Sequence, residues 1–227
     1  MNGRTFTGDT PANSTLERST TLIDHTFVKA QTDNAYPAAT YTVIGSGSCL
    51  LPVSIVSHKV HALAGAFDIN LPLTGVAGIE CRSGGTNNDY TIIYTFDRAL
   101  VSVGSVTVSH GVGGGTGSVS SQTFGPLANQ YTVNVTNVSN AQHLSVTLNG
   151  VQDTAFAVLN NSVARMDVLN SDTTADGFVN SGDIAQTKSQ SGQLITGSNF
   201  REDVTVDGNL NSGDIAFVKS KSGTALP

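Results

Sequence analysis

Two stretches near the C-terminus carry oxygen-bearing side chains at a spacing that suits a calcium ion. They are Asp172–Asp183 and Asp203–Asp214, twelve residues each and offset by 31 residues. When Asp172–Gly192 is aligned with Asp203–Gly223, 14 of 21 positions are identical, so one structural unit occurs twice. Calcium takes about six to eight oxygen ligands, and a loop of about twelve residues supplies them from positions 1, 3, 5, 7, 9 and 12.

Both stretches hold an oxygen donor at each of these positions. In the first, the donors are Asp172, Thr174, Asp176, the backbone carbonyl of Phe178, Asn180 and Asp183. In the second, they are Asp203, Thr205, Asp207, the backbone carbonyl of Asn209, Asn211 and Asp214. Position 6, where the chain must turn sharply and a Cβ is unfavourable, is glycine in both copies, Gly177 and Gly208. We therefore predict two Ca²⁺ sites.

The donor set indicates modest affinity. Each loop offers three carboxylates, because position 3 is threonine and position 12 is aspartate, which reaches less far than glutamate. Such loops suit the roughly millimolar calcium of the extracellular space. The alternative is a pair of loops closed by Asx turns, which hold no metal; the occurrence of two copies in register favours the metal.

The residues around each loop predict a small helical module. A short helix would follow the last ligand and end near Gly192 or Gly223, where a helix C-terminus favours glycine. The apolar residue at position 8, Val179 or Leu210, would pack each loop on a small core. A loop with the pattern D-x-T-x-D-G-x-[V/L]-N-S-G-D, followed but not preceded by a helix, resembles the type I dockerin repeat, whose loop is an EF-hand-type (F-hand) calcium loop. Two repeats make a dockerin, and residues 166–227 have about that length.

The resemblance implies calcium binding and docking onto a cohesin domain. The partner would be a cohesin-like or cell-surface protein. The recognition residues would be those at loop positions 10 and 11 and one lysine in each helix: Ser181, Gly182, Lys188, Ser212, Gly213 and Lys219.

The preceding part of the chain predicts β-structure. Only 12% of the residues are charged and 24 are glycine, a composition that favours strands and polar turns. Runs with alternating polarity are Val53–Ser57, Tyr90–Phe96, Val101–Val108, Tyr131–Val135 and Leu144–Leu148, the last followed by a tight turn at Asn149–Gly150. Their spacing predicts an antiparallel sandwich over residues 50–165. The segment His58–Gly85 is similar to an Ig-like module that precedes dockerin tails in secreted bacterial proteins. The expected fold is thus mainly β, an Ig-like sandwich followed by the dockerin-like module.

Residues 1–49 predict an irregular segment or linker, rich in Thr, Ser and Asn. The chain has no apolar signal segment after Met1 and no apolar run of membrane-spanning length. The net charge is −6, and no basic or aromatic cluster suggests nucleic acid binding.

Cys49 and Cys81 are the two cysteines of the chain. A disulfide between them would fit an extracellular or cell-surface location, as calcium binding does. Two free thiols are the alternative. Neither cysteine belongs to a C-x-x-C motif, so a redox or zinc role is not expected.

No catalytic motif is recognisable in the sequence. Of five histidines, His58 and His61 are the closest pair and the weak candidates for catalysis, although their spacing directs them to opposite faces of a strand. Asp24–His25 near Asp33 is a weaker cluster, and Asp68 with Glu80 could form an acid–base pair.

Three functions follow from these observations. The first is an extracellular, dockerin-like calcium-binding protein that mediates attachment or docking. The second is a calcium-dependent hydrolase of small esters or lactones, such as acyl-homoserine lactones, in which calcium polarises a carbonyl and a histidine acts as general base. The third is the C-terminal sorting or anchoring portion of a larger exoenzyme.

Overall fold

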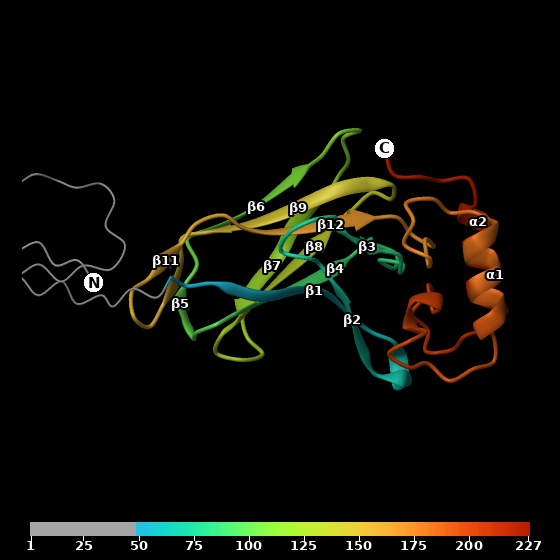
Figure 1. Cartoon of the computed structure of the whole chain (residues 1–227), viewed down its shortest axis with the longest axis horizontal. Coiled ribbons are helices and arrows are strands. Elements are labelled where there is room, and N and C mark those ends of the chain that lie inside the picture. The colour runs from blue at the N-terminus through green and yellow to red at the C-terminus, as the bar shows by residue number, and fades with distance from the viewer. Residues whose placement is uncertain (1–48) are drawn as a thin grey trace, which may run out of the picture. The chain divides into compact units, whose positions relative to one another are not determined.

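The computed structural model describes residues 49–227, which form β-sheets followed by two short helices (Figure 1). The expected segment 1–49, apart from Cys49, and the Asp24–His25 and Asp33 cluster lie outside the described residues. Within the described part, Leu50–Pro227 is one compact unit. None of the helices in this part is both long and apolar enough to cross a membrane.

The first sheet has five strands in the order β2-β1-β4-β8-β7, and all neighbouring strands are antiparallel. In chain order these strands are β1 (Pro52–Val60), β2 (Ala66–Asn70), β4 (Tyr90–Phe96), β7 (Ser118–Phe124) and β8 (Gln130–Thr136). The central strands β4 and β8 alternate strictly between buried and half-buried side chains, which confirms the period-two pattern of their sequences.

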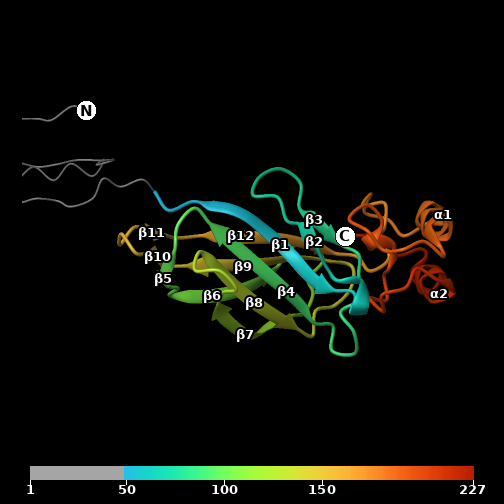
Figure 2. The same cartoon turned by 90° about the horizontal axis from the view of Figure 1, so that it is seen from below.

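The second sheet has the order β3-β12-β9-β6, and a three-stranded sheet, β11-β10-β5, lies at one end of the molecule (Figures 1 and 2). The strands of the second sheet are β3 (Gly78–Glu80), β6 (Ser105–His110), β9 (Gln142–Asn149) and β12 (Ser162–Val168). Those of the third are β5 (Leu100–Ser102), β10 (Val151–Asp153) and β11 (Val158–Leu159). The pairing of β3 with β12 is parallel, whereas the other pairs in these sheets are antiparallel.

The main hydrophobic core lies between the five-stranded and four-stranded sheets. Ile92 and Val133 of the first sheet and Val146 and Met166 of the second are fully buried in one cluster. The side chain of Tyr94 extends across this core, and its hydroxyl donates to the carbonyl of Val146 at 2.7 Å. A mainly β body with antiparallel sheets is therefore confirmed.

The predicted strand Val101–Val108 is wrong as a single element. It is divided into β5 and β6, which belong to different sheets, and the break lies at Gly104. The amide of Gly104 donates to the carbonyls of Asn149 at 2.9 Å and Gly150 at 3.2 Å, so the two glycine-containing bends face each other. The tight turn predicted at Asn149–Gly150 is a bend that carries the chain from β9 into β10, which belongs to another sheet.

The C-terminal residues form two loop–helix halves with reciprocal contacts. Helix α1 (Ser181–Gln190) follows the first loop and α2 (Ser212–Lys221) follows the second, and the two helices contact each other. The amide of Gly192 donates to the carbonyl of Leu210, and that of Gly223 donates to the carbonyl of Val179, both at 2.8 Å. Each half thus ends on position 8 of the other half's loop.

Candidate metal centre and the adjoining cleft

The aspartates at positions 1 and 12 close each loop. Asp172, Asp183, Asp203 and Asp214 are fully buried. In the first loop, Asp172 accepts hydrogen bonds from the amides of positions 5 and 6, at 3.2 and 2.8 Å. Asp183 accepts from the amides of positions 3 and 9, at 3.0 and 2.8 Å. The second loop repeats this pattern with distances between 3.0 and 3.2 Å.

The two buried carboxylates of the first loop converge on one hydroxyl. Thr174 Oγ1 lies 3.4 Å from Asp172 Oδ1 and 3.0 Å from Asp183 Oδ1. Burial raises the pKa of the Asp172 carboxyl, and the neighbouring Asp183 and Asp176 act in the same direction. Burial likewise raises the pKa of Asp214 in the second loop, with a smaller contribution from Asp203.

This donor set fits a hard cation. A buried carboxylate requires a compensating charge, and among the described residues no ion pair involves Asp172, Asp183 or Asp214. The oxygens at positions 1, 3 and 12 are those that a calcium ion would use. At position 6, Gly177 and Gly208 have φ values of 86° and 85°, which confirms the predicted requirement for glycine.

Positions 5 and 9 have a different arrangement. Asp176 and Asp207 accept from the amides of Phe178 and Asn209, at 2.9 and 2.8 Å, which is the geometry of an Asx turn. The side chains at position 9, Asn180 and Asn211, cap the following helices. Within residues 49–227, no three His, Cys, Asp or Glu side chains are grouped as they would be around a metal ion. The side chains at positions 5 and 9 thus follow the Asx-turn alternative, whereas the oxygens at positions 1, 3 and 12 keep the spacing on which the calcium prediction rests.

The residues expected to contact a partner lie toward both ends of the two helices. All six are exposed, four at the first turns of the helices and two near the helix C-termini. They are Ser181, Gly182, Lys188, Ser212, Gly213 and Lys219. Their exposure permits contact with another protein, and their role in docking stays a prediction.

The structure separates the two candidate catalytic histidines. His58 Nδ1 lies 2.7 Å from Asp68 Oδ1 on the exposed face of the five-stranded sheet. His61 is fully buried, and its Nδ1 lies 2.8 Å from Asp203 Oδ2. A residue without exposed surface cannot meet a substrate, so only His58 remains a candidate. Asp68 and Glu80 do not form an acid–base pair, because Asp68 contacts His58 whereas Glu80 is buried in an ion pair with Arg82.

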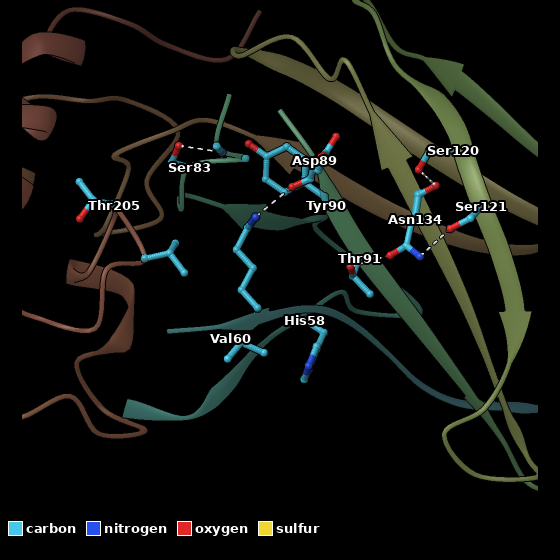
Figure 3. Close-up of a pocket in the computed structure, with 14 residues that line it drawn as sticks. His58, Val60, Ser83, Asp89, Tyr90, Thr91, Ser120, Ser121, Asn134 and Thr205 are labelled. Atoms are coloured by element: carbon cyan, nitrogen blue, oxygen red, sulfur yellow. Dashed lines mark hydrogen bonds between the residues drawn. The ribbon is translucent and has the colours of Figure 1, made fainter. Parts of the chain in front are cut away.

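A polar cleft of about 620 Å³ lies between the outer face of the five-stranded sheet and the second loop. Figure 3 shows Thr205 on one side and Asn134 with Ser121 on the other, and His58 near the base with its ring directed away from the group around Tyr90. Asn134 accepts from Thr91 at 2.7 Å and donates to Ser121 at 2.9 Å, so hydrogen-bonded polar side chains line this face.

The expected disulfide between Cys49 and Cys81 does not form, and the structure has two free thiols. Leu51, two residues after Cys49, pairs with Asp97 at the end of β4, and the nine residues of β1 then separate it from the region of Cys81. Nine residues of strand span about 30 Å, whereas a disulfide needs Cα atoms within about 7 Å. Cys81 is buried, with Sγ 3.5 Å from the carbonyl of Arg201.

Sequence analysis did not identify the two arginines between the sheets and the loops, and it paired Glu80 with Asp68 instead of Arg82. Arg201 donates to the carbonyls of Thr173, Ile79 and Asp172, at 3.2, 3.2 and 3.1 Å. Arg82 and Glu80 form a fully buried ion pair with an N–O distance of 2.8 Å. The sequence offered one signal for this ion pair. Only 12% of the residues are charged, so an arginine next to a predicted strand stands out, and such a residue is rarely buried without a charged partner.

Comparisons of the chain with protein-family models, with curated proteins and with solved structures find no match. The function is therefore argued from the chemistry of the site.

Proposed function

We propose that this chain is an extracellular calcium-binding protein whose dockerin-like loop pair serves in attachment or protein–protein docking. The supporting observation is the set of buried carboxylates at positions 1 and 12, which occurs in the same arrangement in both loops. Calcium bound there would compensate the carboxylate charge. Asp172, Thr174 and Asp183 would hold the first ion, and Asp203, Thr205 and Asp214 would hold the second.

The docking role rests on the exposed ends of the two helices. α1 and α2 are capped in the same way, because Asn180 and Asn211 each accept from the amide two residues later and Asp183 and Asp214 complete a capping box. Since the residue that completes each capping box is also a proposed calcium ligand, the metal would order the surface that carries Ser181 and Ser212. The Ig-like β body would carry this surface.

Calorimetric titration of the chelator-stripped full chain with calcium tests the proposal. We expect two ions per chain, and the loss of one ion in each of the variants Asp172→Ala and Asp203→Ala, with a decrease in helical circular dichroism. Asp68→Ala is the matched control, because this carboxylate lies outside the loops. Two bound ions in the double variant Asp172→Ala/Asp203→Ala, or none in the unmodified chain, would contradict the proposal.

A calcium-dependent hydrolase of small esters or lactones is the second candidate. One observation favours it: His58 and the predicted ligand Thr205 line the same cleft, and Asp68 fixes Nδ1 of His58, which leaves Nε2 to act as a base. Turnover of a small ester and of an acyl-homoserine lactone by the calcium-saturated chain, lost in His58→Ala and retained in His110→Ala, would support this function. Absence of turnover at every calcium concentration would exclude these substrates.

A further inference from the structure

The position 1 carboxylates of the two loops have different neighbours. Within residues 49–227, Asp172 accepts only from groups of its own loop, the amides of Asp176 and Gly177 and the hydroxyl of Thr174. Asp203 accepts from the corresponding amides and, in addition, contacts Nδ1 of His61 at 2.8 Å. His61 lies 142 residues earlier in the chain, directly after β1, and no residue in the described part of the chain takes its place at the first loop.

His61 is itself held by Arg82, and every N–H group of this guanidinium has a hydrogen-bond partner. Arg82 NH1 lies 3.3 Å from Nε2 of His61, and because arginine is only a donor, Nε2 must accept. The imidazole proton is therefore on Nδ1, from which it is donated to Asp203. The remaining N–H groups of Arg82 go to the carbonyls of Phe67 and Ser57 and to both oxygens of Glu80, at 2.8 to 2.9 Å.

The network continues into the sheet. Glu80 also accepts from the hydroxyl of Ser57 on β1. Burial acts to raise the pKa of the Glu80 carboxyl, but the charge and hydrogen bonds of Arg82 outweigh it and bring the pKa to about 2. A buried charge pair of this kind keeps its geometry because each group satisfies the other.

The surroundings of His61 restrict its ring. The imidazole packs edge-on against Phe67, with ring centroids 5.3 Å apart, and against Phe200 at 6.2 Å. The backbone of the second loop is close as well: a Cβ on Gly208 would lie 2.9 Å from the carbonyl oxygen of His61. The amide of Ser83 donates to the carbonyl of Val204 at 2.8 Å, which joins the loop to the residues after β3.

We propose that His61 is a positioning residue for the second calcium site, with Arg82 and Glu80 as its support, so that calcium in this loop is thermodynamically coupled to the five-stranded sheet. The proposal rests on the proposed calcium binding. A hydrogen bond that fixes a metal ligand typically changes metal affinity about 10- to 100-fold. The second loop is therefore the tighter of the two sites, although the loops share most of their sequence.

The test measures each loop alone in the full chain. Asp172→Asn leaves the second loop as the binding site and Asp203→Asn leaves the first, and calorimetry with calcium gives each affinity. We expect His61→Phe to weaken the second loop about 10-fold or more and to leave the first within a factor of two or so. His61→Asn retains an N–H near the position of Nδ1 and should restore part of the affinity, which general loosening of the packing would not explain.

His110→Phe is the matched control, because the His110 ring is also held by a hydrogen-bond partner, Gln142 at 2.9 Å, but lies on β6, outside the loops. It should change neither affinity. An unchanged affinity of the second loop in His61→Phe would overturn the inference while leaving the proposed function intact. Absence of calcium binding in the unmodified chain would instead remove the proposed function.

Hydrogen exchange on the unmodified chain covers the case in which the His61 variants do not fold. Calcium should slow exchange in both loops and also in the last residues of β1, near Ser57 and His58. Protection confined to the loops would overturn the coupling to the sheet. Protection that extends into β1 would support it.

Discussion

The two loops have nearly the same internal hydrogen bonds but different surroundings. In both, the aspartates at positions 1 and 12 close the loop through backbone amides. The first loop is held from outside through its backbone, because Arg201 donates to the carbonyls of Asp172 and Thr173. The second is also held through its backbone, at the carbonyl of Val204, and in addition through a side chain, by His61 on Asp203. A repeated sequence therefore fixes the conformation of each loop, whereas the rest of the fold decides how each ligand is supported.

Removal of Arg82, which supports His61, should have the largest effect on the free energy of unfolding. Arg82→Met leaves Glu80 buried without its partner and His61 without its donor. Loss of one member of a buried pair costs about 3–5 kcal/mol, which urea unfolding would measure. Arg165→Met, which removes an arginine that donates to the carbonyls of Gly75 and Pro72, should cost within about 1 kcal/mol. Equal costs would show that the buried ion pair contributes no more to the stability of the chain than the hydrogen bonds of Arg165 do.

The next largest effect is expected in the alkylation rate of Cys81, whose thiol is buried next to the carbonyl of Arg201. Burial raises the pKa of Cys81 to about 11. At pH 8 roughly one such thiol in a thousand is ionised, so alkylation in the native chain should be at least about 100-fold slower than at the exposed Cys49. Mass spectrometry after timed iodoacetamide treatment measures both rates. Absence of labelling at both cysteines, reversed by a reductant, would instead indicate a disulfide.

The glycines at position 6 compare the two loops directly. Both have positive φ, so alanine costs about 1 kcal/mol in each. A Cβ on Gly208 would also meet the His61 carbonyl at 2.9 Å and the Ala62 Cβ at 3.0 Å, whereas one on Gly177 meets only Leu226 at 3.8 Å. Gly208→Ala should therefore destabilise the chain by about 1–3 kcal/mol more than Gly177→Ala. Equal melting temperatures of the two variants would argue against close packing of the second loop on the sheet.

The smallest effect on stability is expected at His143, which contacts the last residue of the chain. His143 Nδ1 lies 2.7 Å from Asp167, and its Nε2 lies 3.3 Å from the carbonyl of Pro227. The hydrogen bond to Asp167 raises the pKa of His143. The stabilisation is then complete below about pH 6.5 and is lost as the pH rises through the folded value.

The measurement is the pH dependence of unfolding in His143→Gln. The variant should lose under about 1 kcal/mol at pH 5.5 and nearly nothing at pH 9, since the His143 side chain is partly exposed to solvent, which screens its charge. A loss that is independent of pH would show that the pair does not act through the charge of the histidine.

The sequence predicted those features that depend on neighbouring residues. β4 coincides with the predicted run Tyr90–Phe96, because alternation along one strand directly reports its buried face. Gly192 and Gly223 lie just after the helix ends, with φ of 83° and 92°, as helix termination requires. In the first loop, the convergence of Asp172 and Asp183 on the hydroxyl of Thr174 also agrees with the spacing of these residues in the sequence.

Features that depend on distant residues were not predictable in this way. The division at Gly104 depends on its contact with Asn149 and Gly150 in another strand. The contact of His61 with Asp203 joins residues 142 positions apart, and no local pattern marks it. The state of the two cysteines was not predictable either. Whether they pair depends on the distance between the two ends of β1, and the composition of the chain does not reveal that distance.

The reciprocal hydrogen bonds between the two loop–helix halves imply that one half cannot satisfy its backbone groups alone. Gly192 binds the carbonyl of Leu210, and Gly223 binds that of Val179, so neither half satisfies its own position 8. A lone copy could make these bonds only with a second polypeptide, related to it by a two-fold axis. The two joined copies thus make within one chain the contacts that a two-fold dimer of single copies would make between chains, and duplication of one copy would supply both partners at once.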